Sequence, residues 1–131
     1  AYDRILNAVL REVRLSQGDQ AVAKIFDGIA KRAIGKMSPA LAGKTTPERV
    51  EAIAENIRST GVAVDVEERA GTIVLREHNC PYATVVAENP ECCSVIHSIF
   101  DDVVAPGVKQ TESLATGGAE CRFEVASGTT A

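Results

Sequence analysis

The stretch GVAVDVEERAGTIVLREH, residues 61–78, decides the fold of this chain. Apolar and polar residues alternate on both sides of a turn at residues 69–71, which is typical of two antiparallel strands that each bury one face. An isolated hairpin is marginally stable in water, because its apolar face needs further strands or helices to cover it. The hairpin therefore predicts a larger layered structure, to which the flanking segments must contribute.

The flanking segments carry helical periodicity before the hairpin and mixed signals after it. Pro90 suits the first position of a helix and Asn89 can cap it, which predicts a helix from there to about residue 104. The predicted fold class is α+β, with N-terminal helices followed by a small antiparallel sheet that carries one further helix. The other expected elements are helices over residues 1–15 and about 20–36, a connector at 38–47, a helix over 46–60 that Thr46 and Pro47 start and Gly61 ends, and strands near 108–116 and 117–126.

Composition narrows the class of protein. The chain has 131 residues with a formal net charge of −4, so it fits one domain and lacks the basic surface by which proteins bind nucleic acid. No apolar run approaches the length of about 18 residues that a membrane span needs, and we expect a cytoplasmic protein without membrane contact. No glycine-rich phosphate loop, nucleophile elbow or paired-carboxylate motif is found, so we do not expect an enzyme.

Cysteines are the residues most suggestive of chemistry. The chain has four, and without a secretory leader they indicate metal binding, redox chemistry or plain core packing more than a disulfide scaffold. In the expected helix from Pro90, Cys92 lies at the centre of the buried stripe and Cys93 at its edge, one turn before His97 on the same side. Cys121 lies on the inward face of the last strand, and Cys80 directly follows the hairpin. Cys80, Cys93 and Cys121 could thus share one pocket.

Three motifs around these cysteines resemble the C-terminal sensor region of the SufR family of iron–sulfur-responsive repressors. They are Cys80-Pro81, the helix start Pro90-Glu91-Cys92-Cys93 and the strand Gly118-Ala119-Glu120-Cys121-Arg122-Phe123. The resemblance implies a transcriptional repressor whose sensor domain holds an iron–sulfur cluster, of the 4Fe–4S type, through Cys80, Cys93 and Cys121. It also implies a winged helix-turn-helix before residue 1, through which alone the protein would contact DNA.

A fourth ligand is not evident, because the place where some relatives carry another cysteine is near Gly107. His97 is the first candidate, since it shares a helix face with Cys93. His78, Glu120 and Asp101 follow, and an external thiol or a water molecule would also serve.

The chain divides on this view into a linker and dimerisation helix, residues 1–15, and a cluster-binding sensor domain, residues 16–131. The apolar stripe of the helix, which includes Ile5, Leu6, Val9 and Val13, predicts a homodimer. The alternative is that this stripe packs only within its own domain.

Three other functions compete with cluster binding. A structural zinc site would use the same three cysteines and His97. A thiol switch would pair Cys93 with Cys80 or Cys121 in a reversible disulfide. A regulator that senses a small molecule without any metal is the third.

Overall fold

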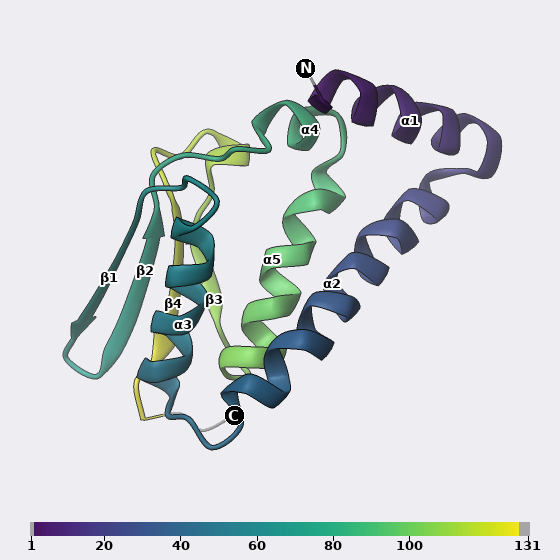
Figure 1. Ribbon diagram of the computed structural model, residues 1–131. Helices are drawn as coiled ribbons and strands as arrows, with labels where there is room; N and C mark the ends of the chain where they lie inside the picture. Colours follow the sequence, from purple (N-terminus) through teal and green to yellow (C-terminus); the bar gives the residue numbers. More distant parts are fainter. Residues whose placement is uncertain (1, 129–131) are drawn as a thin grey trace.

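The computed structural model describes residues 2–128 and confirms the α+β class (Figure 1). Helices come first, a four-stranded antiparallel sheet follows, and further helical segments lie between its strands. The elements are α1 Tyr2–Gln17, α2 Asp19–Leu41, α3 Thr46–Arg58, β1 Val64–Arg69, β2 Thr72–Glu77, α4 Ala83–Glu88, a 3-10 turn Pro90–Cys92, α5 Cys93–Ile99, a π-helical turn Phe100–Val104, β3 Lys109–Glu112, a 3-10 turn Leu114–Thr116 and β4 Cys121–Ala126.

The N-cap of helix α3 lies one residue earlier than the sequence predicts. Thr45, not Thr46, is the N-cap, and its side chain accepts a hydrogen bond from the Glu48 backbone while the Glu48 carboxylate accepts one from the Thr45 backbone. This reciprocal capping box satisfies two backbone donors that the first turn would otherwise leave open. Thr46 is instead buried, and Gly61, with φ +92°, follows the helix end as expected.

The predicted connector at residues 38–47 is wrong over its first half, because α2 runs on to Leu41 with Pro39 inside it. The reason is tertiary: Leu41 is buried in the main core and Met37 packs against that core.

Helix α4 was not predicted at all. It buries Val85 and Val86, and its six residues are too few to show a helical period.

The sheet has the strand order β1-β2-β4-β3, and every neighbouring pair is antiparallel. The predicted hairpin is confirmed, with Arg69 opposite Thr72 across a turn whose Ala70 and Gly71 both have positive φ. Strand β4 inserts between β2 and β3 and places Cys121 opposite Glu77. This register puts the first residue of β4 at the end of β2.

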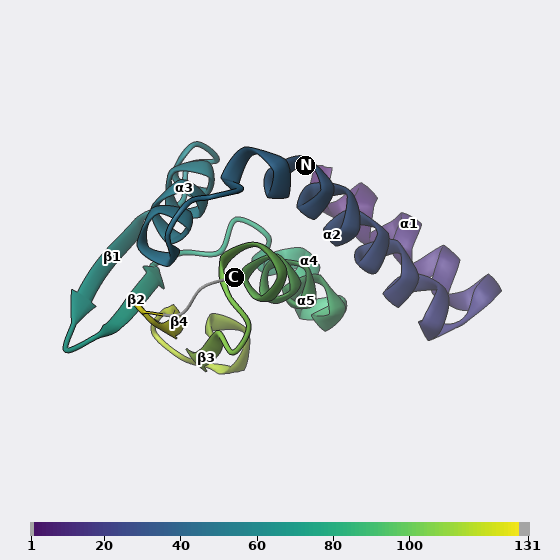
Figure 2. The same cartoon turned by 90° about the horizontal axis from the view of Figure 1, so that it is seen from below.

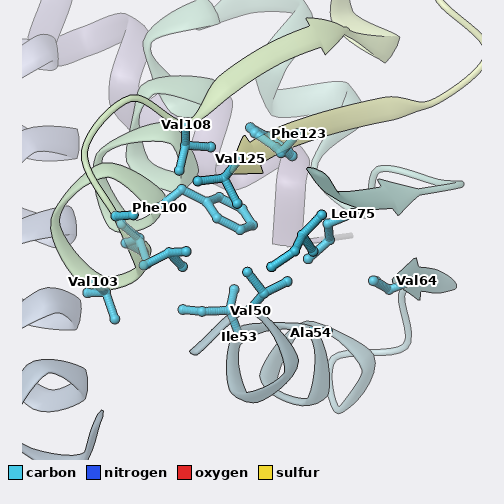
Figure 3. Packing of buried hydrophobic residues seen from close by; sticks show 14 of the residues in the cluster. Val50, Ile53, Ala54, Val64, Leu75, Phe100, Val103, Val108, Phe123 and Val125 are labelled. Carbon is cyan, nitrogen blue, oxygen red and sulfur yellow. The ribbon is translucent and has the colours of Figure 1, made fainter. Parts of the chain in front are cut away.

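Helices α3 and α5 cover one face of the sheet, and α2 lies beyond α5 on the outer side (Figures 1 and 2). The main core fills the space between this sheet face and the covering helices (Figure 3). Phe100 is its largest fully buried side chain, and its ring stacks on Phe123 with centroids 4.6 Å apart. Within residues 2–128, no helix has both the length and the apolar character to cross a membrane.

A second, smaller core joins α1 to the rest of the chain. Leu10, Val22, Phe26 and Val85 are buried there, and Val13 and Cys92 pack against them. The apolar stripe of α1 is therefore divided: Leu10 and Val13 face inward, whereas Ile5 and Val9 are 67% and 52% exposed. Two segments were predicted from the sequence, a dimerisation helix over residues 1–15 and a sensor domain over residues 16–131. Residue 1 of the first and residues 129–131 of the second lie outside the described residues.

Candidate cysteine site

The segments that carry the four cysteines gather at one end of the molecule. In Figure 1 the end of β2, helix α4, the start of α5 and the turn before β4 all lie in the upper part of the molecule, and α4 lies beside α1. Antiparallel pairing brings the end of β2 to the start of β4, and therefore the segment of Cys80 close to that of Cys121. The chain then leaves β2 through Cys80 and returns through α4 to Cys92 and Cys93.

Cys121 and Glu77 form a cross-strand pair on the helix-covered face of the sheet. Glu77 follows Ile73 and Leu75 at two-residue steps on β2, and these oppose Val125 and Phe123, which are buried in the core. Cys121 packs against the same core, as its alternation with Phe123 and Val125 predicted. The Leu114 backbone N–H donates a hydrogen bond to its Sγ at 3.4 Å.

The thiols are close enough for their charges to interact. Burial raises the pKa of Cys93, and Cys80, Cys121 and Glu77 raise it further because negative charge beside a thiol disfavours the thiolate. Burial likewise raises the pKa of Cys121, which the Leu114 N–H partly opposes while Glu77 and Cys80 add to the rise. Cys93 thus has both Cys80 and Cys121 within electrostatic reach.

Cys92 has different surroundings from Cys93. It packs against the smaller core beside α1 and α2. Burial is the main cause that raises its pKa to about 11, followed by the charges of Cys93 and Cys80. Cys92 therefore has the environment of a small core residue, although it remains near two of the other thiols.

Glu77 is the acidic member of this group. One of its carboxylate oxygens, Oε1, is buried and has no hydrogen-bond partner among residues 2–128. Burial raises the pKa of Glu77 to about 7. Glu77 was not among the residues predicted from the sequence, although its place two residues after Leu75 in the alternating pattern indicates the inward face.

Two of the residues considered as a fourth ligand, His78 and Glu120, lie at the same end of the sheet as Cys121 but already have partners. His78 lies 2.6 Å from Asp65 through its Nε2, and Glu120 forms ion pairs with Arg76 and Arg122. His97 and Asp101 lie further along the helical segment from Cys93, one in α5 and one in the π-helical turn. No three His, Cys, Asp or Glu side chains in the described part of the chain stand close enough to hold a metal ion without further movement.

The prediction that Asn89 caps the fourth helix is wrong, because its side chain bonds elsewhere. Asn89 Nδ2 donates to Asn7 Oδ1 at 3.1 Å and to the Val85 carbonyl at 3.2 Å, while Arg14 donates to Asn89 Oδ1 at 3.0 Å. Arg14 also pairs with Glu91 at 3.1 Å. A polar network thus ties α1 to the residues immediately before Cys92 and Cys93.

Replacing Asn89 with alanine is expected to lower the free energy of unfolding by about 1–3 kcal/mol, since it removes the donor to the buried Asn7 Oδ1 and one of the acceptors of Arg14. Urea unfolding of the metal-free protein measures this. Asn56→Ala makes the same change at an exposed position of α3 and should alter stability by less than about 0.5 kcal/mol. Equal effects of the two substitutions would contradict a structural role of the Asn89 network.

Comparison with known proteins identifies the family of this chain. Residues 35–126 match the family model described as methanogen output domain 1. The chain belongs to this family. No curated protein and no solved structure matches the chain.

The match to methanogen output domain 1 covers the sheet, α3 to α5, all four cysteines and Glu77. It begins within α2, so α1 and residues 19–34 of α2 lie outside it. The family is an output domain, which makes this a regulatory type of domain. The match carries no link to the SufR family or to iron–sulfur sensing, and these parts of the resemblance remain predictions.

Proposed function

We propose that this output domain is regulated by an iron–sulfur cluster that Cys80, Cys93 and Cys121 bind. The observation that carries the proposal is the gathering of these three thiols, from a loop, a helix start and a strand, within electrostatic reach of one another. Cluster iron binds thiolates, and three of them from separate segments supply most of a cluster's protein ligands.

The site would have to close when it binds, because no three of its ligands converge in the described residues. Ligands must also lose their protons, so binding is coupled to pH and to the local arrangement of the segments that supply them. A difference between open and closed arrangements is what a regulatory domain needs in order to report ligand binding.

Hydrogen bonds and ion pairs connect the residues next to the site with α1. Arg14 of α1 bonds both Asn89 and Glu91, and these residues stand directly before Cys92 and Cys93. Arg11 of the same helix also pairs with Glu88 at 2.7 Å. Movement of the start of α5 would thus act on α1, through which a DNA-binding domain before residue 1 would receive the signal in a cytoplasmic repressor.

Anaerobic reconstitution with iron and sulfide tests the proposal. We expect a brown protein with broad visible absorption and, for a 4Fe–4S cluster, about four irons per chain. Freshly isolated anaerobic protein that holds stoichiometric zinc and no acid-labile sulfide would contradict cluster binding. Such a result would favour the zinc site instead, which uses the same thiols.

The two remaining alternatives have less support. Burial raises the pKa of Cys93 and Cys121, whereas cysteines that react in thiol switches have lowered pKa values. Small-molecule sites occupy about 300–1,000 Å³. A hollow in the core has about 10 Å³ and another between α2 and α3 about 150 Å³, so neither favours a small-molecule sensor.

We also propose that the protein forms a homodimer through the outer face of α1. Tyr2, Ile5, Leu6 and Val9 are all exposed there, and α2 adds the exposed Ile25 and Ile29. Exposed apolar residues along one face of a helix commonly mark a protein interface. The inward half of the stripe packs within its own chain. The two alternatives predicted from the sequence, dimerisation and packing within the domain, therefore apply to different residues of α1.

Val9→Asp is expected to convert the dimer to a monomer, because it would bury an unpaired charge in the interface. Light scattering of the full chain measures the mass. Ala8→Asp places the same charge one residue away on an exposed position of α1 and should leave the dimer intact. A wild-type protein that is monomeric, or a dimer that both substitutions leave unchanged, would contradict this interface.

A further inference from the structure

Glu77 occupies a position where the sheet otherwise buries apolar side chains. Its row on β2 contains Ile73 and Leu75, which are 2% and 1% exposed, and its cross-strand partner is Cys121. A carboxylate at the end of such a row is held between the sheet and the helices that cover it. The cost of removing a carboxylate from water is large unless a hydrogen bond, a proton or a cation compensates for it.

The other acidic residues near β2 have compensation that Glu77 lacks. Glu120 Oε2 is likewise buried without a hydrogen-bond partner in the described residues, but it forms an ion pair with Arg76 at 3.1 Å. Glu67 pairs with Arg69 at 2.6 Å and with Arg76 at 3.3 Å on the outer side of the sheet. Glu77 Oε1 is buried without any hydrogen-bond partner in the described residues. The charge of Glu77 acts on Cys93 and Cys121, whose pKa values it raises.

We propose that Glu77 is the oxygen ligand that completes the three-thiol site, binding the metal position that no cysteine fills. This inference rests on the proposed function, because it assigns one more ligand to the same site. His78 and Glu120 are less suited to this place, since Asp65 and two arginines already engage them. His97 of α5 is the remaining rival.

Three thiolates and one carboxylate form a mixed sulfur and oxygen donor set, which suits iron or zinc. The oxygen is a harder and weaker donor for these ions than a thiolate. The bound metal ion or cluster would therefore exchange its ligand first at the carboxylate position, while Cys80, Cys93 and Cys121 keep it bound to the protein.

Cobalt(II), added to reduced and metal-free protein without oxygen, is the probe that tests the assignment. Its visible spectrum reports the number of thiolates bound and its titration gives the affinity. Glu77→Gln is expected to weaken cobalt binding by about tenfold or more, with the thiolate bands retained. Glu124→Gln, on the opposite face of β4, and His97→Ala are expected to leave the affinity unchanged.

A second variant and a second measurement separate ligation from folding. Glu77→Cys should restore affinity and add a fourth thiolate to the cobalt spectrum. Thermal unfolding of the metal-free Glu77→Gln protein should show a raised melting temperature, because the substitution removes the charge of a carboxylate whose buried Oε1 has no hydrogen-bond partner among residues 2–128. A purely structural role for Glu77 predicts the reverse, lower stability with the same cobalt affinity per folded molecule.

The outcomes distinguish this inference from the proposed function. Wild-type protein that binds cobalt with the same affinity as Glu77→Gln would overturn the Glu77 assignment and leave the three-thiol site standing. Loss of binding in His97→Ala alone would assign the fourth position to the histidine. Failure of the wild type to bind cobalt would also overturn the assignment, and the iron and sulfide reconstitution would then decide separately whether the thiols bind a cluster.

Discussion

Cys93→Ser is expected to abolish cluster binding or to weaken it strongly, while Cys92→Ser leaves the cluster in place. Cys93 is the thiol that interacts with both Cys80 and Cys121, whereas Cys92 packs into the smaller core against side chains of α1, α2 and α4. Serine retains the shape of cysteine but is a poor ligand for cluster iron. Iron and sulfide content after anaerobic reconstitution measures the effect for both variants.

The cost of Cys92→Ser should lie in stability instead. A hydroxyl would replace a thiol in contact with the smaller core, which should lower the free energy of unfolding of the metal-free protein by about 1–3 kcal/mol. The two adjacent cysteines are thus controls for each other, one for ligation and one for packing. A cluster that depends on Cys92 and survives the loss of Cys93 would show that the start of α5 presents the other thiol to the site.

Phe100→Ala is expected to have the largest effect on folding. Phe100 is 1% exposed and its ring stacks on Phe123, so it joins the helical segment after α5 to the middle of the sheet (Figure 3). Removing a buried phenylalanine side chain costs about 3–5 kcal/mol through lost burial and the cavity that remains. Small domains have total stabilities of about 5–15 kcal/mol, so this loss is a large share of the total. The variant is expected to unfold at a much lower urea concentration than the wild type.

Urea unfolding followed by circular dichroism measures this loss. Tyr82→Ala removes an aromatic side chain that is 55% exposed and should change the free energy of unfolding by about 0.5 kcal/mol or less. A Phe100→Ala protein as stable as Tyr82→Ala would show that the covering helices do not depend on the contact with Phe123.

Much of the fold was predictable because its signals are local. The alternation in residues 64–77 and the turn before Thr72 specify the hairpin, since strand pairing across a short turn depends on neighbouring residues. The three-to-four spacing in residues 2–17 likewise specifies α1. Errors at residues 38–41 and at α4 arose where burial in a distant core, not the local pattern, maintains the helix.

The candidate site was predictable only in part. Three of its residues, Cys80, Cys93 and Cys121, could be named because thiols are rare and chemically distinctive. For Glu77 the alternating pattern indicates the inward face, but only the pairing of β2 with β4 places it opposite Cys121, with an Oε1 that has no hydrogen-bond partner among residues 2–128. A glutamate is usually exposed, so its type alone predicts the wrong side of the sheet.

The sequence by itself determined the class of fold, the hairpin, the helical nature of residues 90–104 and the inward face of Cys121, because periodicity and capping act over a few residues. The tertiary structure alone decided which residues meet. Asn89 has the local context of a helix cap, yet its amide bonds Asn7, 82 residues away, since a buried polar group must find its partner wherever the packing provides one. The same long-range packing divides the stripe of α1 and brings Glu77 to the thiols.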